Sequence, residues 1–282
     1  MTSRLNRWLL ILLVLTGVPF YWLLIDNGPS NVPPKPLSMA ELREAASGVA
    51  GASPTAIAYE TVAHRTRQRN LTAAGTGIRL MNQAVQAFRV EFPGERPIAI
   101  DTGITEREAQ HQDYEEFDAM AQFRVSKAAD EARLIILLAN GPPHDGGLSE
   151  PGMPIPEARR SRIVGQQGQE TGPYAVAPGV VVIPMADVGA QHRLVYVRLK
   201  DGEEFLFAGA IASSDLNWRE VRAPARLMTD YVQPQDREPL LSWLRTVRRL
   251  KDDAPDLHIV PLHELPAKSG LQKGFPKPNG AQ

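Results

Sequence analysis

The N-terminal segment of the chain most constrains its organisation. The run from Trp8 to Ile25 contains no charged residue over 18 positions. A helix of about 17 to 25 apolar residues is long enough to cross the hydrocarbon layer of a membrane. The sequence therefore predicts a single transmembrane anchor over residues 8–25.

Charges on either side of this run predict its orientation. Arg4 and Arg7 precede the run, and Asp26 follows it. Because positively charged flanks stay in the cytoplasm, we expect residues 1–7 to be cytoplasmic. The rest of the chain would then be periplasmic, on a bacterial-type inner membrane. The alternative is a cleaved secretory signal, but its apolar core is about 7 to 15 residues and ends at a small-residue cleavage site.

Composition shifts divide the rest of the chain. Residues 26–36 are rich in proline and are predicted to be a stiff linker. One domain is expected over residues 37–266, and residues 267–282, rich in Gly, Pro and Lys, are predicted to be a disordered tail. Ser38 and Glu41 have the spacing of a capping box, which predicts a helix through about Ala46.

Composition also excludes several classes of function. The chain has 282 residues, 43% of them hydrophobic and 22% charged, which is enough for one full core. Its formal net charge of -1 provides no basic field, so we do not expect it to bind nucleic acid. It contains no cysteine, which excludes disulfides, thiolate metal ligands and cysteine nucleophiles.

The pattern of apolar residues predicts a mixed α/β domain. Residues 134–138 are all apolar, which is typical of a central strand buried on both faces. Asp201-Gly202 is a hairpin turn signal between two further strands. Strands are predicted at residues 85–92, 97–100, 134–138, 180–184, 194–200, 203–208 and 256–260, and helices at 115–125 and 238–250.

Five sequence landmarks follow one another over roughly residues 85–264. They are a strand with an Asp-Thr-Gly turn, a strand that runs into a loop with a Gly-Gly step, a strand-end turn, an Asp-Gly hairpin and a final strand that ends in histidine. They correspond to Ile98–Gly103, Ile135–Leu148, Ile183–His192, Arg198–Ala210 and Val260–His263. Their order resembles the metallo-β-lactamase-fold hydrolases, especially their lactonase-like branch, and this resemblance implies an αββα sandwich.

Most metal ligands that the resemblance implies are replaced in this chain. Non-ligating residues stand at four of the seven positions: Ala139, Gly141, Pro143 and Ala210. The remaining candidates are His144, Asp187 and His263, with Asp101, Asp145, Gly146 and Gly147 as residues of the associated loop. A dinuclear zinc centre needs a bridging carboxylate and further imidazoles, so this set predicts either no cofactor or a single zinc or iron ion.

Two functions remain open at this point. The favoured one is a noncatalytic or residual member of the fold that binds a small molecule or a protein partner in the old cleft. The alternative is a hydrolase of an ester, lactone or amide with one metal held by His144, Asp187 and His263. The simpler interpretation of both histidines is structural, as loop and strand-end hydrogen-bonding groups. The basic stretch Glu157–Arg162 is either substrate-facing or a solvated face.

Overall fold

Two β-sheets form the centre of the domain. The computed structural model describes residues 3–149, 153–165, 172–264 and 270–276. One sheet has the order β11-β1-β2-β3-β5, with β4 paired to β1, and the other has the order β10-β9-β8-β7-β6. The strands of the first sheet are β1 (Ala56–Gln68), β2 (Leu80–Glu91), β3 (Ile98–Ile100), β4 (Glu116–Phe117), β5 (Leu134–Ile136) and β11 (Gln272–Lys273). Those of the second are β6 (Tyr174–Ala177), β7 (Val180–Pro184), β8 (Arg193–Arg198), β9 (Glu204–Phe207) and β10 (His258–Val260).

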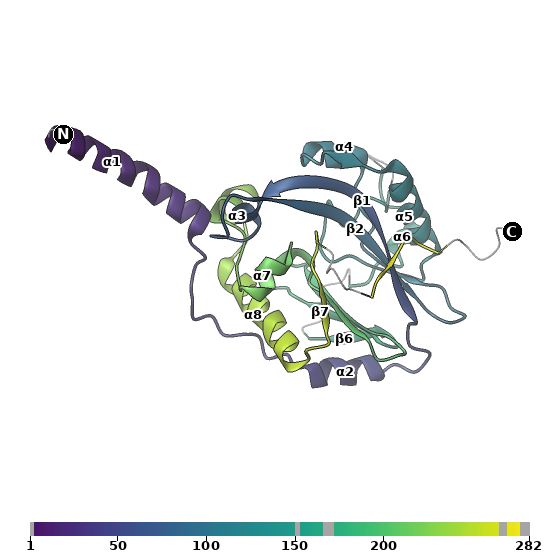
Figure 1. The fold of residues 1–282 in the computed structure, drawn as a ribbon. Coiled ribbons are helices and arrows are strands. Elements are labelled where there is room, and N and C mark those ends of the chain that lie inside the picture. Colours follow the sequence, from purple (N-terminus) through teal and green to yellow (C-terminus); the bar gives the residue numbers. More distant parts are fainter. Residues whose placement is uncertain (1–2, 150–152, 166–171, 265–269, 277–282) are drawn as a thin grey trace.

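Helices cover the outer faces of both sheets. Figure 1 shows α4 and α5 on the β1–β2 side and α2 and α8 on the β6–β7 side. The helices of the domain are α2 (Met39–Ser47), α3 (Arg69–Thr72), α4 (Glu106–His111), α5 (Ala119–Glu131), α6 (Glu157–Arg160), α7 (Asp215–Arg219), α8 (Arg237–Asp253) and the short turns η2 (Gly209–Ile211) and η3 (Leu227–Val232). The expected αββα sandwich is therefore confirmed.

Alternation along β7 shows how the layers are made. Val180 and Val182 belong to the core between the two sheets, while Val181 and Ile183 belong to the core beneath α2 and α8. Successive side chains of a strand point to opposite faces, so an apolar run can contact both layers at once. The sequence predicted this strand with the bounds that the structure gives it.

Helix α8 covers the second sheet as its apolar stripe predicts. Leu240, Leu241, Leu244 and Val247 are all buried against that sheet. Helix α2 begins with the predicted capping box, since Ser38 accepts a hydrogen bond from the Glu41 amide and the Glu41 carboxylate accepts one from the Ser38 amide.

Two predicted elements differ from the structure. The helix expected over residues 115–125 begins only at Ala119, because Asp118 accepts a hydrogen bond from the Ala121 amide and caps it there. Met120, near the start of this helix, is 63% exposed. The strand expected at residues 134–138 is the shorter β5. It is buried on both faces, but it lies at the edge of its sheet and not at the centre.

The two ends of the domain also differ from expectation. Within the predicted disordered tail, Gln272 and Lys273 form β11 and pair in parallel with β1. The predicted linker packs along α8: Val32 is buried, Ser242 donates a hydrogen bond to the Pro33 carbonyl, and the Lys35 amide donates one to Thr246. The linker is therefore part of the folded domain.

A single apolar helix extends away from the domain (Figure 1). It consists of α1 (Ser3–Phe20) and the π-helical turn η1 (Tyr21–Ile25). The segment Arg4–Ile25 is long and apolar enough to cross a membrane, with a mean hydropathy of 2.3, and none of it is buried by protein.

We expect Phe207→Ala to destabilise the domain by about 3–5 kcal/mol, because it removes a large side chain from the core between the sheets. Phe207 is fully buried, and its ring lies edge-on to Phe88 at 4.8 Å between centroids. Phe123→Ala makes the same chemical change on α5 at a residue that is 62% exposed. Urea unfolding of the full chain in detergent should show a lower free energy of unfolding only for Phe207→Ala. An equal decrease in both variants would contradict this assignment of the core.

Candidate functional site

A cavity of about 920 Å³ lies at one edge of the sandwich. Strand-end loops form it, together with the tip of the β1–β2 hairpin, the end of α4 and η3. Loops after strands are a common place for binding groups because a rigid sheet positions them. Four of the chain's six histidines line this cavity: His111, His144, His192 and His263.

Asp101 organises the loop that contains His144. Its Oδ2 lies 2.8 Å from His144 Nδ1, and its Oδ1 accepts a hydrogen bond from the Leu138 amide at 2.8 Å. Asp101 has a φ of 56°, a backbone conformation in which aspartate is one of the few tolerated side chains. Since both residues are buried, the pair fixes the His144 ring and leaves its Nε2 as the ring nitrogen available to a ligand in the cavity.

The Gly146-Gly147 step has a structural reason. A Cβ on Gly146 would lie 2.4 Å from the Ile104 Cα, and one on Gly147 would lie 2.5 Å from the Thr102 carbonyl oxygen. The loop therefore packs directly on the turn after β3. Asp145 closes the same loop by accepting a hydrogen bond from the Gly141 amide, and its burial raises the pKa of its carboxyl group.

His263 also lines the cavity and follows β10. Its Nδ1 lies 2.9 Å from the Ala84 carbonyl oxygen, so Nδ1 carries the proton. Burial lowers the pKa of His263 to about 3, and the positive charge of Arg65 adds to this effect. His263 is therefore a neutral imidazole over the physiological pH range.

The structure brings His144 and His263 to one cavity but does not bring Asp187 there. Asp187 lies on the helical side of the second sheet, where its carboxylate is 2.5 Å from Lys35 Nζ and accepts a hydrogen bond from Trp243 Nε1. His192 occupies the cavity wall instead. Burial lowers the pKa of His192, and the proximity of His144 lowers it further.

The donor set does not fit a dinuclear metal centre. Ala139, Pro143 and Ala210 line the cavity at three of the positions where the resemblance implies a metal ligand or an aspartate. Among the residues that the structure describes, no three His, Cys, Asp or Glu side chains form a group able to hold a metal ion.

Two arginines that the sequence analysis missed line the same cavity. Arg65 donates to Gln83 Oε1 and to the Gln112 carbonyl, and its guanidinium lies 4.5 Å from the Tyr114 ring centroid. The Arg67 guanidinium donates a hydrogen bond to the Met228 sulfur at 3.1 Å. In the described part of the chain, neither arginine forms an ion pair with a carboxylate. Burial, followed by repulsion from Arg65, lowers the pKa of Arg67.

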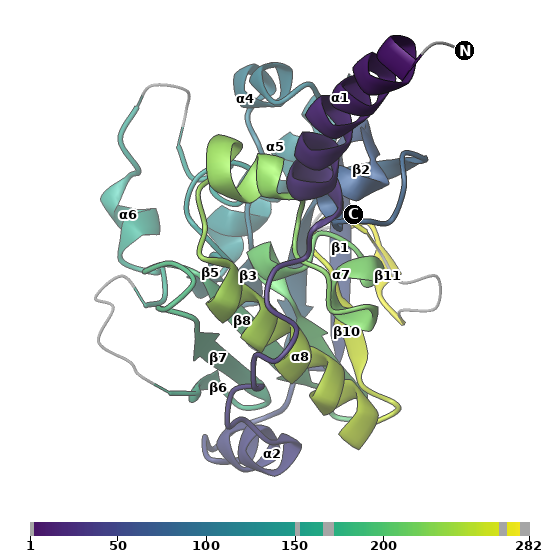
Figure 2. The same cartoon turned by 90° about the vertical axis from the view of Figure 1, so that its left-hand side faces the viewer.

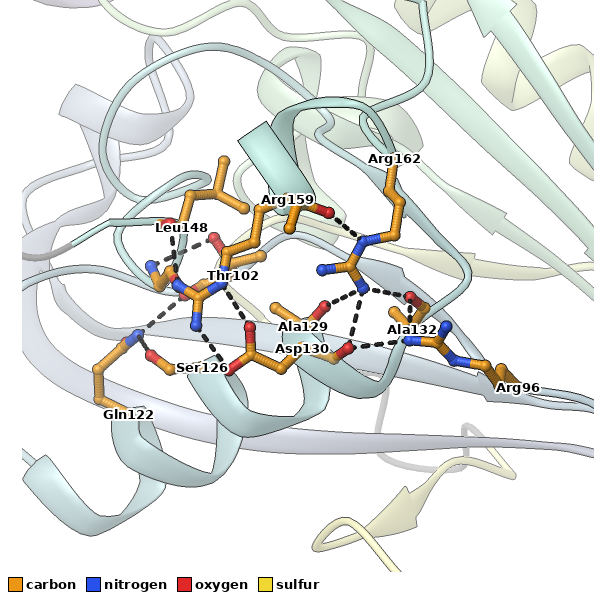
Figure 3. A network of polar contacts seen from close by, with 12 residues as sticks. Arg96, Thr102, Gln122, Ser126, Ala129, Asp130, Ala132, Leu148, Arg159 and Arg162 are labelled. Carbon is orange, nitrogen blue, oxygen red and sulfur yellow. Dashed lines mark hydrogen bonds and ion pairs between the residues drawn. The ribbon is translucent and has the colours of Figure 1, made fainter. Parts of the chain in front are cut away.

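The basic stretch 157–162 stabilises the site loop from behind. Arg159 binds the Asp130 carboxylate and the Gly147 and Leu148 carbonyls, and Arg162 binds carbonyls at the end of α5 (Figure 3). Positive charge at a helix C-terminus is favourable because the last carbonyls lack partners. These two arginines therefore join the loop to α5 and do not line the cavity.

Comparison with solved structures confirms the resemblance at the level of the fold. An N-acyl homoserine lactone hydrolase with N-hexanoyl-L-homoserine at its metal centre is 14% identical, with a TM-score of 0.56 over 75% of this chain and 94% of that one. A probable metal-dependent hydrolase from Staphylococcus aureus is 9% identical, with a TM-score of 0.56 over 76% and 91%. The dizinc lactonase AidC is 11% identical, with a TM-score of 0.51 over 78% and 92%.

The chain therefore has the metallo-β-lactamase fold. No protein-family model matches the sequence, and no curated protein matches it. At these identities the likeness extends to the fold alone, and the site has to be interpreted from its own residues.

We expect His263 to make the domain acid-sensitive. The unfolded histidine titrates near 6.5 and the native one near 3, so between these values only the unfolded chain binds the proton. The free energy of unfolding therefore falls as the pH falls through this window, by up to about 1.4 kcal/mol per pH unit.

His263→Asn keeps an N–H donor for the Ala84 carbonyl but cannot titrate. Urea unfolding from pH 7 to 4 should show a smaller loss of stability in this variant than in the unmodified chain. Equal losses would show that the acid sensitivity arises elsewhere.

Proposed function

We propose that this chain is a membrane-anchored binding protein that holds a small anionic molecule in the cavity at the edge of its sandwich. One observation supports this most directly: Arg65 and Arg67 line the cavity, and no carboxylate pairs with either among the described residues. Among the described residues that line the cavity, Asp113 is the one acidic residue, so the arginines leave an excess of positive charge. A bound carboxylate or phosphate would supply the missing partner.

The anchor is the second part of this proposal. The unburied apolar segment Arg4–Ile25 supports it. The charges of Arg4 and Arg7 before the segment favour a cytoplasmic N-terminus, which would place the cavity on the periplasmic side.

We expect Arg67→Gln to weaken the binding of an anionic ligand about tenfold or more, because a hydrogen bond to a charged group contributes about 1.5–3 kcal/mol. The probe is N-hexanoyl-homoserine, which carries a carboxylate and is the product bound by a structurally similar lactone hydrolase. Isothermal titration calorimetry on the full chain in phospholipid nanodiscs gives the dissociation constant.

Arg107→Gln is the matched control for this experiment. Arg107 is exposed on α4 and does not line the cavity, so its loss should leave the dissociation constant unchanged. Failure of the unmodified chain to bind the probe, or equal binding by Arg67→Gln, would contradict the proposed function.

A hydrolase with one metal ion is the second candidate. His144, His192 and His263 line the same cavity, which favours it, although three protein ligands in close array are the usual minimum for catalytic zinc. His144 keeps the backing carboxylate of Asp101, an arrangement often found behind metal-bound histidines.

Metal analysis of the full chain, purified without chelator, separates the two candidates. We expect the unmodified chain and the double variant His144→Ala, His263→Ala to contain the same trace of metal, because too few donors converge. About one zinc or iron ion per chain that disappears in the double variant would instead support the hydrolase.

A further inference from the structure

The end of the apolar helix is fixed to the domain. The Asp26 carboxylate lies 2.6 Å from Arg226, whose guanidinium also lies 4.0 Å from the centroid of the Trp22 ring. The Leu24 carbonyl accepts a hydrogen bond from the Gly75 amide at 3.0 Å. Asn27 adds two hydrogen bonds, to the backbone of Val221 and Ala223. These contacts hold the domain in one position relative to the helix axis.

The length of the helix determines the depth of these contacts in a bilayer. The 22 residues of Arg4–Ile25 rise about 33 Å, which matches a hydrocarbon core of about 30 Å. When the helix spans the membrane, Ile25 and Asp26 lie at the interface. The domain surface that contacts Trp22 to Asp26 must then lie at the level of the lipid headgroups.

Five large apolar side chains are exposed on this surface. We call them the apolar rim: Ile78 and Leu80 on the β1–β2 hairpin, and Leu227, Tyr231 and Val232 on η3. Figure 1 shows α1 leaving the domain beside α3 at the tip of this hairpin, and Figure 2 shows η3, in green, beside the base of α1.

Backbone and side-chain contacts join the two halves of the apolar rim. Arg67 on the hairpin contacts Met228 on η3, and the Ala225 amide donates a hydrogen bond to the Leu71 carbonyl. Exposed apolar side chains that gather in one place mark a surface that another apolar phase covers. Arg79 is exposed within the same hairpin loop and suits anionic headgroups.

The turn η3 also forms a wall of the cavity. Met228, Thr229 and Val232 line the cavity, whereas Tyr231, on the same turn, does not line it and is 69% exposed. One short element therefore separates the interior of the cavity from the surface at the base of the apolar helix.

We propose that the apolar rim inserts into the interface of the same membrane that α1 spans, and that the cavity behind it receives an anionic amphiphile directly from the lipid phase. The acyl chain enters past η3, and the anionic group reaches Arg65 and Arg67. This inference rests on the proposed anchoring and anion binding, and it adds the source and the chemical class of the ligand.

The absence of cysteine from the chain allows single-cysteine labelling. Ile78→Cys and Tyr231→Cys report the apolar rim, and Leu13→Cys reports the helix. Lys200→Cys is the control. The Lys200 amide donates a hydrogen bond to the Pro54 carbonyl, and Pro54 lies just before the start of β1, at the end of the strand farthest from the hairpin tip. The 13 residues of β1 place that end of the strand about 40 Å from the hairpin tip.

Each variant of the full chain carries an environment-sensitive fluorophore in vesicles with and without brominated phospholipid. We expect bromine to quench the labels at positions 13, 78 and 231, but not at 200. Quenching at 13 without quenching at 78 and 231 would overturn this inference and leave the anchoring intact. An unquenched label at position 13 would overturn both the insertion of the apolar rim and the anchoring by the helix.

Entry from the lipid is tested by association rates of ligands that differ in chain length. Tyr231→Asp should slow the association of vesicle-borne N-dodecanoyl-homoserine severalfold and leave that of water-soluble N-butanoyl-homoserine unchanged. An equal effect on the two ligands, or none on either, would overturn entry through the apolar rim.

Discussion

Apolar contact between the two sheets is the constraint on which the rest of this structure depends. Phe88, Val90 and Ile100 of one sheet meet Val195 and Phe207 of the other. This contact closes the sandwich and brings the strand-end loops of both sheets to one edge. His144 follows a strand of the first sheet and His263 follows a strand of the second, so the cavity exists only because the sheets are held face to face.

Much of the fold could be predicted from local pattern, and the exceptions have physical reasons. The apolar run of β7 and the amphipathic stripe of α8 are each set by residues close in sequence. Strand β1 was missed although β2 follows it in a hairpin, because its other partners, β4 and β11, lie far along the chain and its final residues alternate basic and polar side chains. That alternation puts Arg65 and Arg67 on one face of the strand, and it was the available signal for the positive wall of the cavity.

The candidate site separates into a scaffold that the sequence predicted and a chemistry that it did not. Asp101, Gly146 and Gly147 were expected beside the site, and they hold the His144 loop through close backbone contact and two carboxylate hydrogen bonds. Asp187 was assigned by its position along the chain. Its local turn instead directs the carboxylate to Lys35 and Trp243, across the second sheet from the cavity. Neighbouring positions of a turn can face opposite sides of a sheet. Metal ligands that are assigned by alignment along the sequence therefore have to be tested against the three-dimensional structure.

The segment expected to be a linker has the largest consequence for function. A proline-rich spacer that made no contact with the domain would leave the orientation of the cavity relative to the apolar helix unfixed. Here Asn27, Val32 and Lys35 are bonded to or buried against the domain, and Asp26 is paired with Arg226 at the helix end. The orientation of the cavity relative to the helix axis is therefore a fixed property of the fold. The cavity has a positive wall, and the apolar rim lies beside it at the base of that helix. This combination suits a ligand with an anionic group at one end and an apolar chain at the other.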